Sequence, residues 1–279
     1  MNGKGLLSVV LVASLCSVIA YKVIEQMPIK HVHDQDKAAT ALETSTVQKP
    51  PLQHLACVID GNRRYAKARG LSTLAGHNKG YETQKMVIRF CLEKGIKYLS
   101  LYIFSIENFR RAQEEQDYLF TMALNEAEHG LAEFKKHGVR VRIIGDKSLF
   151  PESLKGAFER AERETAHLDK LQVNLLFCYG GQQEIAASVQ SIARQVQQGL
   201  LKPEEITPQT IAKNLWLADI PEPDLIIRTG GFKRMSNFLL YQSAYSEFVF
   251  LDCMGPELTV AHLEKAVNEF VQCKRNFGA

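Results

Sequence analysis

Residues 55–65 read LACVIDGNRRY, a short apolar run that ends in an aspartate, a glycine and two adjacent arginines. An apolar run of this length before a turn signal is typical of a strand that is buried on both faces. Five further runs of the same kind follow along the chain. The six predicted strands span residues 55–60, 98–105, 139–145, 171–179, 224–228 and 247–252.

Most of the segments between these strands have the apolar spacing of amphipathic helices. The predicted helices span residues 80–94, 116–137, 153–167, 183–198 and 260–274. Helices of this length carry the chain back to a parallel neighbouring strand. The sequence therefore predicts an α/β fold, a single domain in which helices flank both faces of a central, mostly parallel six-stranded sheet.

The 279 residues carry a formal net charge of +3, and 46% of them are hydrophobic and 23% charged. These proportions are typical of a soluble globular domain and exclude a disordered chain, a collagen-like repeat and a polytopic membrane protein. The balance is too weakly basic to favour a nucleic-acid partner. The six cysteines form no CxxC pair, and we expect buried free thiols in a reducing compartment.

The N-terminal segment differs from the rest of the chain. Residues 5–21 (GLLSVVLVASLCSVIAY) contain no charged side chain, and Lys4 and Lys22 flank them. As a helix this run is about 25 Å long, close to the thickness of a bilayer core. Residues 1–21 are thus predicted to be a membrane anchor or a cleavable signal peptide. Polar residues 22–53 are predicted to be a flexible linker, and the folded domain is predicted to span 54–279.

Arginines and glycines follow several of the predicted strands. The segments are DGNRRY (60–65), SIENFRR (105–111), GD (145–146), YGG (179–181) and TGGFKRMS (229–236). In an open parallel sheet, ligands bind beyond the carboxyl ends of the strands. Guanidinium groups bind phosphate oxygens through paired, charge-assisted hydrogen bonds, so the sequence predicts an anion site at this edge.

The sequence disfavours a nucleotide as this anion, because the chain contains neither a GxxxxGK[ST] loop nor a GxGxxG fingerprint. A diphosphate without a nucleoside fits better. Asp60 and Glu247 end one predicted strand and begin another. If they meet, their carboxylates offer the hard oxygen ligands that Mg²⁺ shares with substrate phosphates.

Several of these motifs together resemble the cis-prenyltransferases, the family of undecaprenyl and dehydrodolichyl diphosphate synthases. They are DGNRRYAK (60–67), GH (76–77), FSIENFRR (104–111), GD, YGG and IRTGGFKRMSNFLLYQSAYSE (227–247). The resemblance covers residues 54–279. It implies an isoprenyl transferase that condenses isopentenyl diphosphate with an allylic diphosphate such as farnesyl diphosphate. It also implies Mg²⁺ as the cofactor and a homodimer.

The resemblance also implies a role for individual residues. Asp60 and Asn108 match the catalytic positions, and Asp60 and Glu247 match the metal-associated carboxylates, with Glu247 acting across a dimer. Asn108 stands where the family places proton removal, but an amide is a weak base, so we expect it to orient a water or a substrate diphosphate. The implied substrate-binding residues are Gly61, Asn62, Arg63, Arg64, Tyr65, His77, Ser105, Ile106, Glu107, Phe109, Arg111, Arg228, Arg234, Met235 and Ser236. Of these, Arg228, Arg234 and Ser236 match the isopentenyl diphosphate site.

Two positions depart from the family pattern. Thr73 stands four residues before His77, where the family usually has an arginine, and Asn276 interrupts a C-terminal Arg-x-Gly element. A growing polyprenyl chain also needs an apolar tunnel. Its candidate lining is equally the expected core face of amphipathic helices, and the core interpretation is favoured. The candidates are Met86, Val87, Phe90, Leu119, Phe120, Met122 and Leu124.

Two alternatives to a long-chain synthase remain open on these residues. One is a divergent enzyme of the same fold that makes a short or irregular prenyl diphosphate. The other is a non-catalytic subunit of a heteromeric prenyltransferase, which the retained Asp60, Asn108, Arg228 and Arg234 disfavour. Because isopentenyl diphosphate is cytosolic and a long prenyl product partitions into lipid, we expect residues 5–21 to hold the domain on the cytoplasmic face of a membrane.

Overall fold

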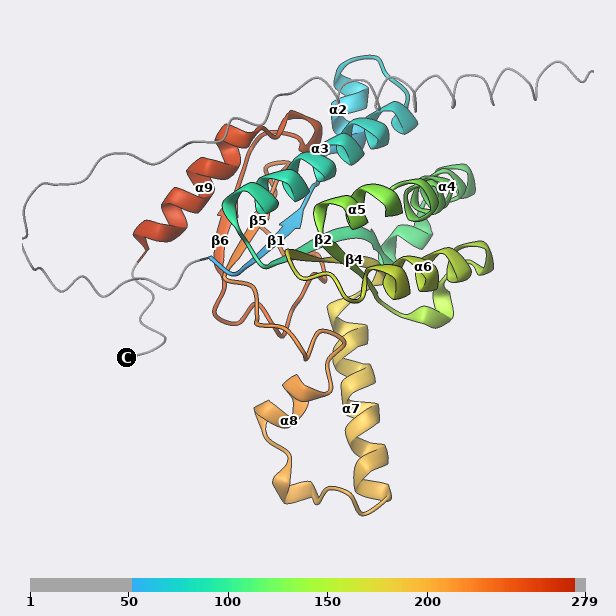
Figure 1. Cartoon of the computed structure of the whole chain (residues 1–279), viewed down its shortest axis with the longest axis vertical. Helices are drawn as coiled ribbons and strands as arrows, with labels where there is room; N and C mark the ends of the chain where they lie inside the picture. The colour runs from blue at the N-terminus through green and yellow to red at the C-terminus, as the bar shows by residue number, and fades with distance from the viewer. Residues whose placement is uncertain (1–51, 274–279) are drawn as a thin grey trace, which may run out of the picture. The chain divides into compact units, whose positions relative to one another are not determined.

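A computed structural model describes residues 52–273 (Figure 1). All six predicted strands are present, with bounds that differ from the prediction by at most two residues. They are β1 (His54–Val58), β2 (Tyr98–Ser105), β3 (Val139–Ile144), β4 (Leu171–Tyr179), β5 (Leu225–Arg228) and β6 (Glu247–Phe250). The last residue of the predicted linker, Gln53, is tied to the folded domain, because its backbone N–H donates to the Asp224 carboxylate at 2.9 Å.

The strands form one sheet in the order β3-β4-β2-β1-β5-β6, and all five pairings are parallel. On one side of β1 the chain places β2 next to it, then β3 at the far edge and β4 between β3 and β2, and it then returns to place β5 and β6 on the other side. The strand order therefore reverses around β1. In open α/β sheets the crevice at such a reversal, beyond the carboxyl ends of the strands, is where ligands bind.

Helices cover both faces of the sheet, as predicted. They are α2 (Asn62–Ala68), α3 (Thr73–Lys94), α4 (Gln113–His129), α5 (Leu131–His137), α6 (Glu152–Thr165), α7 (Gly181–Gln197), α8 (Pro208–Lys213) and α9 (Val260–Gln272). Short 3₁₀ turns span Ile106–Arg110 (η1), Lys147–Leu149 (η2), Pro203–Glu205 (η3) and Gly255–Glu257 (η4). In Figure 1, α3 and α9 lie across one face, while α7 and α8 project away from the sheet.

Alternation along β1 divides the core between the two faces. Leu55 and Cys57 belong to the larger cluster, which includes Phe90 of α3 and Leu263 of α9. Ala56 and Val58 belong to a smaller cluster on the other face. Because both sides of β1 are covered, every residue of the strand is buried, which explains its continuous apolar run.

Two predicted helices differ from the structure near glycines. Helix α3 begins at Thr73, seven residues before the prediction, because the Ser72 hydroxyl caps it by accepting from the Ala75 N–H. A Cβ at Gly76 would lie 2.3 Å from the Asn62 carbonyl oxygen, so this glycine lets α2 lie against α3. The predicted helix 116–137 is divided at Gly130 into α4 and α5.

Some of the expectations from the sequence fall on residues 1–51 and 274–279, outside the described part of the chain. These are the anchor or signal segment 5–21, most of the linker 22–53, and the departure at Asn276. No helix within residues 52–273 is long and apolar enough to cross a membrane. The five cysteines in this part of the chain are all free; Cys57, Cys91 and Cys178 are buried, and Cys253 and Cys273 are half-buried.

Candidate active site

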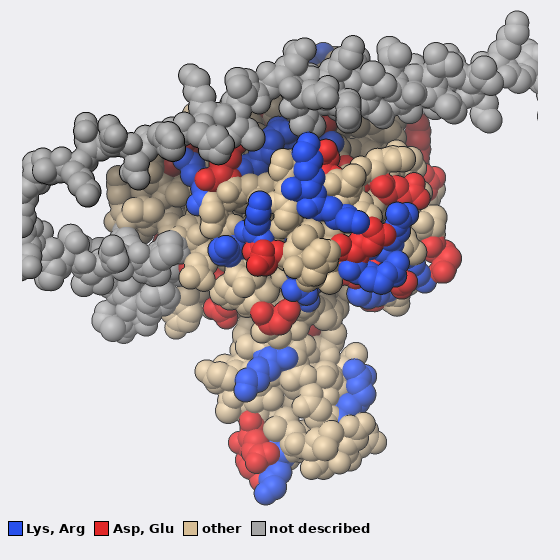
Figure 2. Space-filling model, in the orientation of Figure 1, with Lys and Arg blue, Asp and Glu red and all other residues tan. Residues whose placement is uncertain are grey.

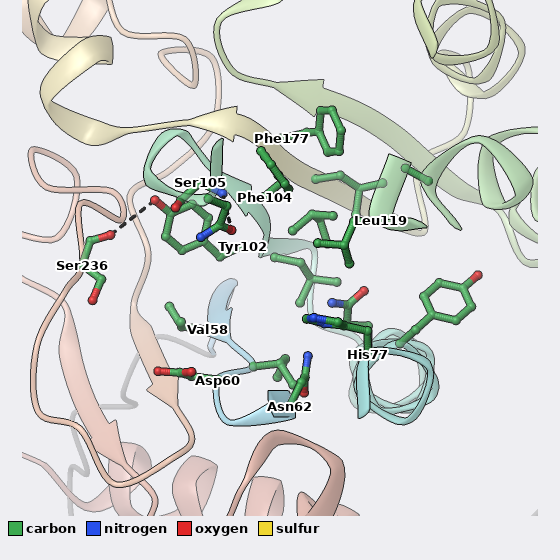
Figure 3. Close-up of a pocket in the computed structure, with 18 of the residues that line it drawn as sticks. Val58, Asp60, Asn62, His77, Tyr102, Phe104, Ser105, Leu119, Phe177 and Ser236 are labelled. Atoms are coloured by element: carbon green, nitrogen blue, oxygen red, sulfur yellow. Dashed lines mark hydrogen bonds between the residues drawn. The ribbon is translucent and has the colours of Figure 1, made fainter. Parts of the chain in front are cut away.

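A cavity of about 1040 Å³ opens at the carboxyl ends of β1, β2 and β5 (Figure 3). This volume is at the upper end of the range for small-molecule sites. Most of the predicted site residues line the cavity: Asp60, Gly61, Asn62, Arg63, Arg64, His77, Ser105, Glu107, Asn108, Arg111, Arg228, Arg234, Met235 and Ser236. The GD and YGG segments after β3 and β4 do not line it, although Ile143 of β3 and Phe177 of β4 do.

Asp60 and Arg228 form the centre of the polar end. Arg228, at the end of β5, is buried, and its Nη2 donates to Asp60 Oδ2 at 2.7 Å. A second bond links the same two segments, because the Thr229 hydroxyl donates to the Asp60 carbonyl oxygen at 2.8 Å. Arg64 Nη1 donates to the Gly230 carbonyl oxygen at 2.7 Å, and its Nη2 lies 3.7 Å from Asp60 Oδ1. The segments 60–64 and 228–236 are far apart in sequence, but these bonds join them into one polar cluster.

Two buried nitrogen atoms of this cluster make no hydrogen bond within the described residues. Arg228 Nε and Arg64 Nη2 are inaccessible to solvent and have no hydrogen-bond partner within residues 52–273. An unpaired buried polar group is costly, so such donors indicate a place for an anionic ligand.

The loop after β5 is held in an unfavourable backbone conformation. Ser236, Asn237 and Leu239 all have positive φ values, of 52°, 63° and 41°, a region that non-glycine residues seldom adopt. Arg228 Nη1 offsets this by donating to the Arg234 carbonyl oxygen at 2.5 Å and to Ser236 Oγ at 2.8 Å. The Tyr102 hydroxyl also donates to the Ser236 carbonyl oxygen; this bond is the dashed line that starts at Ser236 in Figure 3.

Glu115, which the sequence analysis missed, connects three of the predicted residues. Its buried carboxylate lies 2.9 Å from His77 Nε2, 3.2 Å from Arg111 Nη1 and 3.8 Å from Arg63 Nε. Burial is the main cause that lowers the pKa of His77, and the nearby arginines add to it, against the opposing effect of Glu115. The available sequence signal was only the spacing of four residues between Arg111 and Glu115. Arg111 lies before α4 begins, and the pair meets because Glu115 lies in the first turn of that helix.

Asn108 uses its side-chain oxygen to build the loop. Asn108 Oδ1 accepts from the Ser105 N–H at 3.1 Å and so closes η1. Asn108 lines the cavity, and its other amide atom, Nδ2, can only donate a hydrogen bond. This geometry agrees with a group that orients a water or a diphosphate and disagrees with a general base.

Three predicted substrate residues do not line the cavity. Phe109 packs in the aromatic core, with its ring centroid 5.0 Å from that of Phe104. The Tyr65 ring stacks under the Arg69 guanidinium at 4.1 Å. Ile106 lies in η1, and of the residues in this turn only Glu107 and Asn108 line the cavity.

Glu247 lies at the opposite edge of the sheet from Asp60. Leu225 pairs with both Leu55 and Glu247, so Glu247 is level with the start of β1. Asp60 is five residues farther along, about 16 Å at the rise of a strand. One chain therefore does not bring the two carboxylates together, and a joint metal site stays a prediction for an assembled dimer.

The other end of the cavity is apolar. In Figure 3, Phe104, Phe177 and Leu119 lie away from Asp60, Asn62 and Ser236. Of the seven candidate tunnel residues, Leu119 and Met122 line the cavity, and the other five belong to the hydrophobic core or pack against it. The core interpretation thus holds for most of these seven residues, while Leu119 and Met122 of α4 form part of the cavity wall.

Charged side chains of both signs are interspersed on the face seen in Figure 2. The small net charge thus conceals a local excess of arginine at one end of the cavity, where Arg63, Arg64, Arg111, Arg228 and Arg234 converge.

The fold and the site define an enzyme of prenyl diphosphate chemistry. Residues 58–278 match the Prenyltransf family, described as "Putative undecaprenyl diphosphate synthase". The chain belongs to this family, the cis-prenyltransferases, and is an isoprenyl transferase.

Curated relatives and solved structures agree with this assignment. The chain is 39% identical over 241 residues to a farnesyl-diphosphate-specific ditrans,polycis-undecaprenyl-diphosphate synthase of Xanthomonas campestris pv. campestris, covering 86% of this chain and 93% of that protein. It is 42% identical to an isoprenyl transferase of Brucella abortus, over 81% and 89% of the two chains. Lavandulyl diphosphate synthase of Lavandula x intermedia, solved with dimethylallyl diphosphate, superposes with a TM-score of 0.78 at 32% identity, over 81% and 98%. A probable undecaprenyl diphosphate synthase of Campylobacter jejuni superposes with a TM-score of 0.68 at 34% sequence identity, over 82% of this chain and 100% of that chain.

Proposed function

We propose that this enzyme condenses isopentenyl diphosphate with an allylic diphosphate such as farnesyl diphosphate to make a cis-polyprenyl diphosphate, with release of diphosphate. The observation that carries the proposal is one cavity with two ends. Unpaired arginine donors gather at the end near Asp60, and apolar side chains line the end near Leu119. A prenyl diphosphate has the same division between an anionic head and a hydrocarbon tail.

The residues divide between two diphosphates. Arg63, Arg64 and His77 would hold the allylic diphosphate and stabilise the negative charge that develops as its C–O bond breaks. Arg228, Arg234 and Ser236 would hold isopentenyl diphosphate, whose double bond forms the new C–C bond. As the new C–C bond forms, the internal carbon of the former double bond becomes cationic. A proton then leaves the carbon between this cationic carbon and the diphosphate-bearing carbon, which restores a double bond, and Asn108 Nδ2 would orient the water or diphosphate oxygen that accepts the proton.

Mg²⁺ is the proposed cofactor, and the residues fit a metal that is shared with substrate. Residues 52–273 contain no group of three metal-ligating side chains. Asp60 supplies a single carboxylate that is 33% exposed, and Mg²⁺ commonly binds through one or two carboxylates plus substrate phosphates and water. Bound there, Mg²⁺ would neutralise charge on the diphosphate.

The proposal extends to assembly and location. A homodimer would allow Glu247 of one subunit to complete the site of the other. A membrane anchor at residues 5–21 would keep the domain near its lipid product, on the cytoplasmic face where isopentenyl diphosphate is made.

A second candidate is a short-chain or irregular prenyl diphosphate synthase, because a lavandulyl diphosphate synthase shares the fold at a TM-score of 0.78. Incubation of the purified full-length chain with Mg²⁺, isopentenyl diphosphate and farnesyl or dimethylallyl diphosphate separates the two. A ladder of linear C5 additions on farnesyl diphosphate supports the proposal, whereas a single short or branched product supports the second candidate. If no diphosphate is released from the chain alone, the enzyme needs a partner subunit.

Glu115→Gln is expected to raise the KM for the allylic diphosphate about tenfold, or roughly 1.4 kcal/mol. The substitution removes the carboxylate that holds His77, Arg111 and Arg63 together. Initial rates at varied allylic diphosphate measure the change. Glu114→Gln, on the exposed side of α4, is the control, and equal KM values for the two variants would remove Glu115 from the site.

Thr73→Arg is expected to lower the KM for the allylic diphosphate several-fold. Thr73 is the first residue of α3 and lies one turn before His77 on the same helical face. An arginine there would add a charge-assisted contact, against a small cost of about 0.5 kcal/mol for a cation at a helix N-terminus. Thr73→Gln is the uncharged control. An unchanged KM for Thr73→Arg would mean that other cations already supply this contact.

A further inference from the structure

Two helices form facing walls of the cavity, and their lining residues have helical spacing. From α3 these are His77, Tyr81, Gln84, Lys85 and Ile88, and from α4 they are Leu119, Met122, Ala123, Glu126 and Ala127. The α4 wall is apolar except at Glu126. The α3 wall stays polar for two turns beyond His77, and the diphosphate chemistry leaves this feature unexplained.

These polar residues lie far from the diphosphate end of the cavity. Lys85 is eight residues beyond His77, about 12 Å along α3, and Glu126 is eleven residues beyond Glu115, about 16 Å along α4. His77 and Glu115 mark the diphosphate end. Tyr81, Lys85 and Glu126, which we call the polar belt, therefore cross the part of the cavity that would hold hydrocarbon.

The contacts within the polar belt leave its groups poorly satisfied. Lys85 Nζ lies 3.9 Å from Glu126 Oε2, a long ion pair, and 4.4 Å from the centre of the Tyr81 ring. The Tyr81 hydroxyl is buried and has no hydrogen-bond partner within the described residues. Burial raises the pKa of Glu126 to about 7, which indicates that the charged carboxylate is poorly solvated here.

The position of Glu126 is also constrained by the fold. A Cβ at Gly130, where α4 gives way to α5, would lie 2.5 Å from Glu126 Oε1. The carboxyl group thus packs over the break between the two helices. The apolar lining of the cavity also includes Phe134 of α5 and Phe158 of α6.

We propose that the polar belt determines product length: it stops elongation once the hydrocarbon tail must lie across Tyr81, Lys85 and Glu126. Each added C5 unit pushes the tail farther along the cavity. A tail that covers the belt must strip water from the half-exposed Glu126 carboxyl and Lys85 ammonium groups without replacing their hydrogen bonds, beside a Tyr81 hydroxyl that already lacks a partner among the described residues. Release then competes with the next addition. This inference rests on the proposed function.

The test compares product lengths in full-length variants. Glu126→Leu combined with Lys85→Met removes both charged groups of the belt at similar side-chain size, and its main product is expected to be at least one C5 unit longer than that of the native enzyme. Glu126→Gln keeps a polar group in place and should give a shift smaller than that of the double variant. Products made from farnesyl and isopentenyl diphosphates are resolved by mass.

Glu82→Gln is the matched control. Glu82 Oε1 also lies 3.9 Å from Lys85 Nζ, but its side chain is 61% exposed and does not line the cavity. Its products should match those of the native enzyme. Unchanged or shorter products from a folded double variant would overturn the proposal, as would an equal shift from Glu82→Gln. If the native enzyme itself releases no diphosphate, the proposed function fails rather than the role of the belt.

Discussion

Replacing Asp60 with asparagine is expected to lower kcat about 10³-fold, or roughly 4 kcal/mol of transition-state stabilisation. Asparagine has nearly the same shape and still accepts a hydrogen bond from Arg228, so the loop after β1 should keep its position. The lost charge is the carboxylate that is paired with Arg228 and Arg64 and that would hold Mg²⁺ against a diphosphate. Diphosphate release at saturating substrates and Mg²⁺ measures the effect.

Asp252→Asn is the control for this substitution. Asp252 is exposed, follows β6 at the same edge of the sheet and does not line the cavity. The two variants should unfold at similar temperatures, while only Asp60→Asn loses turnover. If Asp60→Asn kept a tenth or more of the native kcat, the role of Asp60 in holding the metal and the diphosphate would be wrong.

Arg228→Lys is expected to lower kcat/KM for isopentenyl diphosphate about 100-fold and the free energy of unfolding by about 2 kcal/mol. The guanidinium of Arg228 bonds Asp60 Oδ2, the Arg234 carbonyl oxygen and Ser236 Oγ at the same time. A lysine ammonium retains the charge but not the planar fork, so it cannot hold all three. The loop from 234 to 239, with its positive φ values, would then relax.

Kinetics at varied isopentenyl diphosphate and thermal unfolding together test this prediction. Arg142→Lys is the control, because Arg142 bonds both oxygens of Asp219 at 2.7 and 2.9 Å and does not line the cavity. That variant should retain native kcat/KM. A native kcat/KM in Arg228→Lys would show that the charge alone suffices and that the geometry of the fork is unimportant.

The two substitutions separate what the pair contributes. Asp60→Asn preserves the hydrogen bond and removes the negative charge, whereas Arg228→Lys preserves the positive charge and removes part of the hydrogen bonding. Loss of turnover in the first with little loss of stability, and loss of both in the second, is the pattern expected when Asp60 acts on substrate and Arg228 also builds the site.

The helix boundaries show where reading the sequence was weakest. The predicted helix began only at Gly80, yet Gly76 also lies within α3. Both glycines admit the Asn62 backbone and side chain at distances that a Cβ would prevent. A glycine that breaks a helix and one that admits a neighbour look alike in one sequence. The distinction depends on which segment packs against it.

The sequence by itself determined the sheet and the polar residues of the site. Buried parallel strands need continuous apolar runs, and a diphosphate needs arginines at strand ends, so both features are local in the sequence. The tertiary structure alone decided which of these residues meet. It paired Asp60 with Arg228, 168 residues apart, and placed Glu247 at the opposite edge through the register of β5 and β6. It also gathered His77, Arg111 and Arg63 around Glu115 and set Lys85 against Glu126. Such contacts depend on strand order and helix packing, and residue type and local spacing do not specify them.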